Sequence, residues 1–440
     1  MNRTIKAEKL SLKELIAMGV GGMVGGGIFS VLGLSVGLAG HAAPVAFLIG
    51  GVIAALTGYS YSKLGLTFHS DGGSFTYMEK SVKNKNIAAL GGWVLLVGYI
   101  GTLALYSYTF GAYGAAMAGK SSHTVMLQHF FASLIILTFL GVNLYGIKAA
   151  GHTELVIVII KVIILLLFAV MGLFFVKENY VLPLFNKSAS NLFMGAALIF
   201  VAYEGFELIP NAQNEMENPK KNLPKSIMIS IFITIFIYLL VSFVAVGNLT
   251  PEKISQYKEY ALAEAAKPFL GQTGFILIGL GALLSTASAI NATLFGTARL
   301  GMSMAQEEDL PKVFSFKERT KNIPWVSLVI ISAFTLAFVN IADLTLISSF
   351  ASSTFLLIFM FINFSAIKLN KTIGIKPLYP ALAFIFSSIS WVVLMVYLYR
   401  TDANGFLWLG FFYLLVFVAE FLFSKRNIFI RFTEKNRDKK

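Results

Sequence analysis

The sequence predicts an all-α polytopic membrane protein with twelve transmembrane helices, of which helices 1 and 6 are broken. Three observations predict this class. The 440-residue chain is 57% hydrophobic and only 13% charged, whereas soluble proteins carry about 25% charged residues. Twelve apolar segments are long enough to cross a bilayer, which takes about 20 residues. Two of them carry glycine or proline near the centre, where a helix is interrupted.

The apolar segments follow one another closely, with three longer loops between them. The segments cover 12–40, 44–68, 87–117, 122–145, 153–176, 189–216, 225–247, 273–304, 324–341, 343–367, 377–399 and 404–423. Two longer loops, 69–85 and 306–323, are polar and basic, and the third, 248–272, contains a good helix former at 260–267. We expect that stretch to form a short helix over the outer mouth, and we expect no soluble domain.

The first apolar segment contains a cluster of glycines. Five of the seven residues from Gly21 to Gly27 are glycine, and each costs about 1 kcal/mol in a helix interior. Irregular backbone at membrane depth is tolerated only where it is buried in protein or lines a cavity. The cluster therefore predicts a broken helix beside a solute cavity, with close packing of small residues as the alternative. Ser11 and Glu14 have the spacing of a capping box that opens this helix.

The basic residues gather on one side of the predicted bundle. The net charge is +13, with 35 Lys and Arg residues. With the N-terminus inside, about 27 of them lie in cytoplasmic segments, in agreement with the positive-inside rule. We therefore place residues 1–11 and the basic tail 424–440 in the cytoplasm. The protein is predicted to span the cell membrane, to contact lipids and to bind no nucleic acid.

The chain lacks the residues of several other functional classes. It has no cysteine, which excludes disulfides, thiolate metal sites and cysteine nucleophiles. Its five histidines have no metal-ligand spacing, and no nucleophile–base pair or phosphate-binding motif appears. The N-terminus shows no signal peptide, since its apolar run continues as a full span. We expect no enzyme activity, no metal and no cofactor.

Lys161 lies within the fifth apolar segment. At 1.5 Å per residue it is roughly 12 Å from the cytoplasmic end of that helix, at a depth where a lysine costs about 2.5–3.5 kcal/mol to insert. One interpretation is that its side chain extends back to the membrane surface. The other, which we favour, is an inward-facing amine that changes its protonation state during a transport cycle.

The sixth segment carries two carboxylates, Glu204 and Glu207, on either side of Gly205 and shortly before Pro210. Proline removes a backbone donor, so the helix bends or ends there. Intramembrane carboxylates are functional candidates by default. These two either bind a substrate ammonium group or a proton, or hold exposed amides of the break.

The two interrupted segments are five spans apart and therefore run in opposite directions across the membrane. Broken helices at corresponding positions of two antiparallel halves indicate an inverted-repeat transporter with its site at the midplane. The repeats are predicted at 12–176 and 189–367, with an appended pair of helices at 377–423.

The two breaks offer complementary partners for an α-amino acid. Gly25, Gly26 and Gly27 expose amide N–H groups at a helix N-terminus, which suits a carboxylate. Carbonyl groups in the other break suit an ammonium group. The predicted substrate site comprises nine residues of the two breaks: Met23, Gly25, Gly26, Gly27, Ile28, Phe200, Val201, Tyr203 and Glu204.

The eighth segment has a polar stripe that includes Ser285, Thr286 and Ser288. Such hydroxyls often bond only the backbone four residues earlier. The alternative is that they contact Lys161 from across the bundle. The predicted proton-coupling residues are Lys161, Glu207, Ser285 and Thr286.

Several stretches resemble the amino acid–polyamine–organocation superfamily of secondary transporters. Gly25–Phe29 (GGGIF) resembles the glycine break in the first span of that family. Tyr203–Glu207 (YEGFE) continues into Glu217–Pro224 (ENPKKNLP), a strong signature of the family, and Ala263–Gly271 in the outer loop adds to it. The resemblance covers nearly the whole chain, through the twelfth apolar segment.

The resemblance implies a leucine-transporter-like fold with five-plus-five inverted repeats. Within the superfamily, the sequence is most similar to archaeal proton-coupled amino acid transporters of broad specificity. Their fifth span carries a lysine where sodium-coupled relatives bind an ion, and Lys161 matches it. Ser285 and Thr286 match hydroxyl ligands of those sodium-coupled relatives. Val201 stands where several members place an aromatic gate, and Glu204 where some carry an apolar residue.

These features together predict proton-coupled amino acid import by alternating access, with protons as the coupling ion. An amino acid or polyamine exchanger that does not use the proton gradient is one alternative. A channel or a nutrient-sensing receptor on the same scaffold is another.

Overall fold

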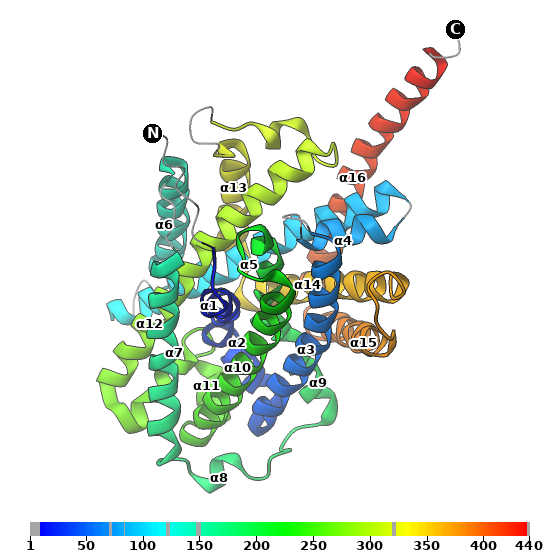
Figure 1. The fold of residues 1–440 in the computed structure, drawn as a ribbon. Coiled ribbons are helices and arrows are strands. Elements are labelled where there is room, and N and C mark those ends of the chain that lie inside the picture. The colour runs from blue at the N-terminus through cyan, green and yellow to red at the C-terminus, as the bar shows by residue number, and fades with distance from the viewer. Residues whose placement is uncertain are drawn as a thin grey trace, which may run out of the picture.

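The computed structural model describes residues 9–69, 73–82, 84–119, 124–146, 151–318 and 323–437, and within them the regular structure is helical. Figure 1 shows the arrangement of the helices. In chain order they are α1 Leu12–Met23, α2 Gly27–Ala39, η1 Gly40–Ala42, α3 Ala43–Thr67, α4 Gly73–Ser81, α5 Lys85–Ala118, α6 Thr124–Tyr145, α7 Gly151–Leu173, α8 Glu178–Val181, α9 Ala189–Leu198, η2 Phe200–Tyr203, η3 Phe206–Glu215, α10 Pro219–Asn248, α11 Pro251–Gln256, α12 Ala261–Gln306, η4 Lys312–Ser315, α13 Trp325–Ile341, α14 Leu344–Lys368, α15 Leu378–Thr401 and α16 Ala403–Arg437.

In the described part, nine helical stretches are long and apolar enough to cross a membrane, and ten when the bent pair of α9 with η2–η3 is taken as one. Ten is two fewer than the twelve predicted segments, and there are two reasons for the difference. α2 and α3 follow each other directly through η1, so residues 27–67 form one apolar stretch, although Gly40 with a φ of 61° turns the chain between the two helices at the predicted boundary. The other reason is that α13 has only 17 residues. Each predicted segment nevertheless contains helix. The chain is therefore a multi-pass membrane protein.

The helices separate into a central set and an outer set. In their most apolar windows, α5 and α14 are 67% and 72% buried, whereas α6 and α16 are only 11% and 17% buried. The exposed side chains of α16 include Leu407, Trp408 and Phe411, and a helix that is apolar all round belongs in a core or a bilayer. In Figure 1, α4 lies at one end of the bundle, and α8 and α11 lie toward the other.

The first apolar segment is broken where the glycine cluster predicts a break. α1 ends at Met23 and α2 begins at Gly27, so residues 24–26 form the turn between them. At the start of α1, Ser11 N–H donates to Glu14 Oε2 at 2.7 Å. The predicted capping box is therefore confirmed.

The sixth apolar segment is also broken. Its two halves are bent by 50°, and Gly205 joins η2 to η3 with φ at 128°, a conformation that glycine adopts readily. The second half, η3, is a 3₁₀ helix that contains Pro210, which cannot donate a backbone hydrogen bond. The proline thus lies where regular α-helical pairing is absent.

The helix expected at 260–267 is present as the first part of α12. α12 begins at Ala261 and bends at Gly271, whose φ is 59°, before it continues into the long apolar stretch. Within the first part, Lys267 Nζ lies 2.7 Å from Glu264 Oε1 and 4.5 Å from the centre of the Phe275 ring. The contact between Lys267 and Phe275 fastens the short helix to the span that follows it.

The signature segment 217–224 shapes the start of α10 and receives the N-terminal residues. Asn222 Nδ2 donates to Glu217 O at 2.6 Å. Leu10 N–H donates to Glu215 O at 2.7 Å, and Leu10 O accepts from Glu217 N–H at 3.0 Å. This backbone bridge ties the start of α1 to the end of η3.

Asp309 follows the end of α12 and has a perturbed acidity. Burial, followed by the charges of Glu307 and Glu79, raises the pKa of Asp309 from 3.8 to about 6. Because the folded protein binds the proton of Asp309 more tightly than the unfolded chain, the carboxyl contributes to the free energy of unfolding below pH 3.8. This contribution is lost as the pH rises through 6.

Asp309→Asn is therefore expected to stabilise the protein above pH 6 and to have no effect near pH 4. The group is half exposed and screened, so we expect a melting temperature about 1 °C higher at neutral pH. Thermal unfolding in detergent at both pH values measures this. Glu308→Gln, at the exposed neighbouring position, is the control, and an equal gain of Asp309→Asn at both pH values would contradict the prediction.

Candidate functional site

The two broken helices meet at a pair of glycines. A Cβ placed on Gly205 would lie 2.6 Å from Gly22 C and from Met23 N, and a Cβ on Gly22 would lie 2.8 Å from Gly205 Cα. These separations are shorter than any that a real Cβ tolerates against backbone. Both positions therefore need glycine for the breaks to touch, and this crossing is the centre of the candidate site.

Side chains from four other helices hold the carbonyl groups that end α1. The last carbonyls of a helix lack partners within it and need others when they are buried. The four bonds run from Lys161 Nζ on α7 to Gly21 O (2.8 Å), from Tyr106 Oη on α5 to Gly22 O (3.4 Å), from Tyr238 Oη on α10 to Met23 O (2.6 Å) and from Ser285 Oγ on α12 to Val24 O. The broken end of α1 is therefore held by four helices at once.

The second break is held from α14 and α10. Ser352 Oγ donates to Leu198 O at 2.6 Å and accepts from Val201 N–H at 3.0 Å. Tyr238 Oη also lies 2.9 Å from Ala202 O. A hydroxyl has one proton to donate, so Tyr238 shares it between one carbonyl of each break. This tyrosine links the two broken helices directly.

Lys161 is fully buried on the inward face of α7. Its Nζ reaches the first break, so the side chain does not extend back to the membrane surface. Ile160 and Ile163 on the same helix are 41% and 55% exposed, which identifies the opposite, outward face. The side chain therefore points into the bundle, as the second interpretation requires, and its change of protonation state stays a prediction.

Glu204 and Glu207 are buried beside the second break, with 3% and 1% of their surfaces exposed. Thr102 Oγ1 on α5 donates to Glu204 Oε2 at 2.5 Å. Gly205 N–H donates to Glu207 Oε2 at 2.7 Å. Glu207 therefore holds an amide of the break, and Glu204 is directed toward α5.

The glycines at the start of α2 lie against aromatic side chains. A Cβ on Gly26 would meet the ring of Tyr106, and a Cβ on Gly27 would lie 2.6 Å from Tyr238 Oη. Gly25 N–H already donates to Gly22 O at 3.1 Å. Close packing is thus one use of these glycines, and the amide of Gly25 is already bonded within the break.

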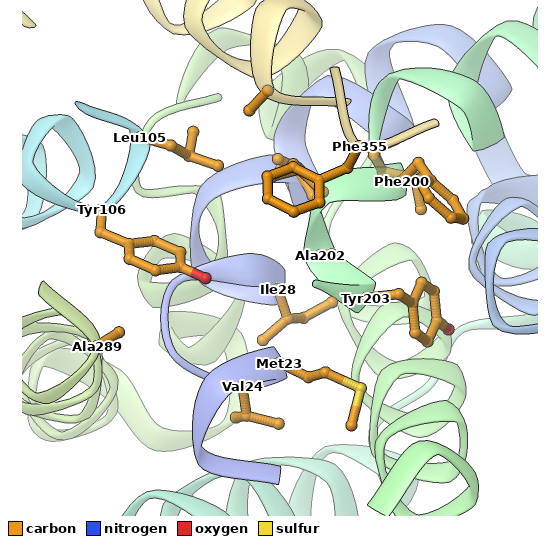
Figure 2. Packing of buried hydrophobic residues seen from close by; sticks show 14 of the residues in the cluster. Met23, Val24, Ile28, Leu105, Tyr106, Phe200, Ala202, Tyr203, Ala289 and Phe355 are labelled. Carbon is orange, nitrogen blue, oxygen red and sulfur yellow. The ribbon is translucent and has the colours of Figure 1, made fainter. Parts of the chain in front are cut away.

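Figure 2 shows the side chains gathered around the two breaks. They come from the first break, from the second break, and from α5, α12 and α14: Met23, Val24, Ile28, Phe200, Ala202, Tyr203, Leu105, Tyr106, Ala289 and Phe355. All of them are buried. Apolar and aromatic side chains therefore pack closely around both breaks.

The side chains of Phe200 and Tyr203, the two aromatic residues predicted in the substrate site, contact the neighbouring helices α14 and α3. Tyr203 Oη donates to Phe47 O on α3 at 2.7 Å. Phe200 packs edge-on against Phe359, with ring centroids 5.4 Å apart. In Figure 2, Phe355 of α14 points toward the breaks instead.

The adjacent hydroxyls of α12 have different partners. Ser285 reaches across to Val24 O, whereas Thr286 Oγ1 bonds back to Ala282 O at 2.7 Å. Ser285 and Lys161 therefore belong to the same row of carbonyl partners along the end of α1. Thr286 bonds the backbone four residues earlier, which was the first of the two interpretations of this polar stripe.

Sequence reasoning missed Tyr238, Ser352 and Thr102. A phenol in the middle of the long apolar run of α10 was a usable signal for Tyr238. Ser352 carries no comparable signal, because α14 has five buried hydroxyl residues between 348 and 354. Their importance comes from partners far away in the chain.

Replacing Tyr238 by phenylalanine is expected to loosen both breaks. The change removes the shared donor and leaves two buried carbonyls without it, which costs about 1–3 kcal/mol. We expect a lower melting temperature and at least about tenfold slower transport, since a 1.4 kcal/mol change in a barrier corresponds to tenfold in rate.

Tyr203→Phe is the matched control for this change. It also removes one hydroxyl from a fully buried tyrosine, but the lost partner is Phe47 O on α3. The control is expected to lower stability without the same loss of transport. Equal transport losses in the two variants would contradict a special role for Tyr238.

The chain is similar to known proteins over most of its length. The amino acid permease family matches residues 10–424, which include both breaks. The chain is 34% identical to the uncharacterized protein MJ0609 of Methanocaldococcus jannaschii over 407 residues, 92% of each chain. It is 29% identical to the inner membrane transport protein YbaT of Escherichia coli, over 83% of this chain and 84% of that protein.

A third relative is the serine/threonine exchanger SteT of Bacillus subtilis, which is 26% identical over 73% of this chain and 74% of its own length. The family match spans the glycine cluster, the second break and the helices that hold them. The chain therefore belongs to the amino acid permease family, within the amino acid–polyamine–organocation superfamily, and is a transporter and not an enzyme.

Proposed function

We propose that this protein imports amino acids across the cell membrane in symport with protons, by alternating access. The observation that carries the proposal is the bond from Lys161 Nζ to Gly21 O at the end of α1. A charged donor makes a bond roughly twice as strong as a neutral one. Loss of the proton from Lys161 therefore weakens the hold on a broken helix, which is how protonation couples to movement.

We further propose twelve spans in two inverted repeats. In this arrangement α1 and α2 form span 1, and α9 with η2 and η3 forms span 6. The repeats are residues 12–176 and 189–367, followed by the pair at 377–423. The contact between Gly22 and Gly205 supports this topology, because corresponding broken helices of inverted repeats meet near the midplane. The charge asymmetry supports cytoplasmic termini.

The amino acid is proposed to bind between the two breaks. Its carboxylate would lie on the amides of Gly26 and Gly27, where the positive end of α2 favours an anion. Its ammonium group would lie on carbonyls of the second break, within Phe200–Tyr203. Met23 and Ile28 line the same place from the first break. No cofactor is needed in this scheme, and protons are the coupling ion.

Exchange without net proton movement is a second candidate function. The similarity to SteT, which is named as an exchanger, favours it. In that case Lys161 would be a fixed cation that holds Gly21 O throughout the cycle.

One experiment separates the two functions. Purified protein in liposomes is supplied with a labelled amino acid mixture in sodium-free buffer, with and without an inward proton gradient. Accumulation only with the gradient is the result expected for symport. Uptake that ignores the gradient but needs internal amino acid would establish exchange instead.

A further inference from the structure

A carboxylate on α7 lies close to the Lys161 amine and has no role in the site described so far. Glu154 precedes Lys161 by two helical turns, so both project from one face of the helix. Both side chains converge on Gly21, where a Cβ would lie 3.0 Å from Glu154 Oε1 and 3.9 Å from Lys161 Nζ. The two charged atoms are therefore no more than about 7 Å apart, a separation at which charges interact strongly inside a protein.

The Glu154 carboxylate is held in place from α12. Ser288 Oγ lies 3.2 Å from Oε1 and 3.1 Å from Oε2 of Glu154. Ser288 is one turn beyond Ser285, whose hydroxyl bonds Val24 O. One face of α12 thus supports both the end of α1 and the carboxylate beside it.

Glu154 is also the more accessible member of the pair. It is half-buried in the first turn of α7, whereas Lys161 is fully buried deeper in the helix. The carboxylate therefore lies between the amine and the end of the bundle at which α7 begins.

The surrounding helices leave Glu154 as the charged neighbour of this amine. The elements packed most closely against α7 are α12, α10 and α1. Their titratable residues are Lys13 and Glu14 on α1, Lys220, Lys221, Lys225 and Tyr238 on α10, and Glu264, Lys267 and Arg299 on α12. Glu154 is the carboxylate that the structure places beside Gly21 together with the Lys161 amine.

We propose that Glu154 relays protons between Lys161 and the water at the start of α7. The inference rests on the proton coupling proposed above. An N–H bond of the Lys161 ammonium breaks and an O–H bond forms on Glu154, through one bridging water, which leaves a neutral amine and a carboxylic acid. The acid then gives up its proton to bulk water and becomes a carboxylate again. On the proposed topology this water is cytoplasmic, so the relay releases the proton that enters with the substrate.

Glu154→Gln tests the relay. Glutamine keeps the size of the side chain and can still bond Ser288, but it cannot accept the proton. We expect gradient-driven uptake in liposomes to become at least about tenfold slower and to lose its dependence on internal pH. Counterflow of labelled against unlabelled amino acid moves no net proton, and we expect it to stay near the wild-type rate. Ser288→Ala, which keeps the carboxylate and loses its hydroxyl partner, is the control and should retain the pH dependence.

The outcomes separate the relay from the function on which it rests. If wild-type uptake ignores the gradient, the proposed symport is wrong and the relay falls with it. If the wild type responds to the gradient and Glu154→Gln responds equally, at every internal pH, the relay alone is wrong. Parallel losses of uptake and counterflow in Glu154→Gln would show a structural role and also overturn it.

Discussion

Replacing Lys161 by alanine is expected to abolish accumulation driven by a proton gradient. A gradient of about two pH units supplies about 2.7 kcal/mol per proton, which supports roughly 100-fold accumulation of a substrate that moves with one proton. Without the amine, the end of α1 has no partner whose charge responds to pH, and the internal and external concentrations should become equal. Uptake of a labelled amino acid into liposomes at imposed gradients measures this ratio.

A control must separate the loss of a proton carrier from the loss of one bond to α1. Ser285→Ala serves this purpose, because Ser285 bonds Val24 O in the same row of carbonyls and does not titrate in the relevant range. Although Ser285 belongs to the predicted proton-coupling residues, its hydroxyl only holds Val24 O, so the variant is expected to slow transport and to retain the response to the gradient. If Lys161→Ala accumulated substrate as the wild type does, the proposed role of Lys161 in coupling would be wrong.

Much of the helical framework follows from local chemistry that a single sequence displays. The capping box of Ser11 and Glu14 predicts the start of α1, and the glycine cluster predicts its end, because both effects operate within a few residues. Gly205 and Pro210 predict the second break in the same way. The 3₁₀ winding of η3 was not predictable, since it depends on how the helices pack.

The glycines and charged residues of the candidate site were predictable from the sequence, whereas the side chains from other helices that bond the two breaks were much less so. Lys161 stands out because a charge in an apolar segment is costly, and the structure places it at the first break. The link made by Tyr238 joins residues 215 positions apart in the chain, and nothing in the sequence near Met23 reveals it. Glu207 was open between two roles, and its bond to Gly205 N–H became visible only once the break had a shape.

Replacing Gly205 by alanine is expected to have the largest effect on folding of any single substitution at the site. Two independent costs add. The φ of 128° is a conformation that residues with a side chain rarely adopt, and such strain costs about 1–3 kcal/mol. The new Cβ would also lie 2.6 Å from backbone atoms of Gly22 and Met23, which forces the two broken helices apart. We expect little folded protein in detergent and no measurable uptake.

Two further glycine variants divide this effect into its causes. Gly22→Ala meets Gly205 Cα at 2.8 Å from the other side of the contact, but has an ordinary helical backbone. It should therefore fold better than Gly205→Ala and still lose transport. Gly296→Ala on α12 adds a Cβ that meets nothing within 4 Å, so it should be neutral or stabilising by up to about 1 kcal/mol. If all three variants melted and transported alike, contact between the breaks would not be what the glycines provide. If only the two at the crossing fail, the contact between the broken helices is necessary both for the fold and for movement of the substrate.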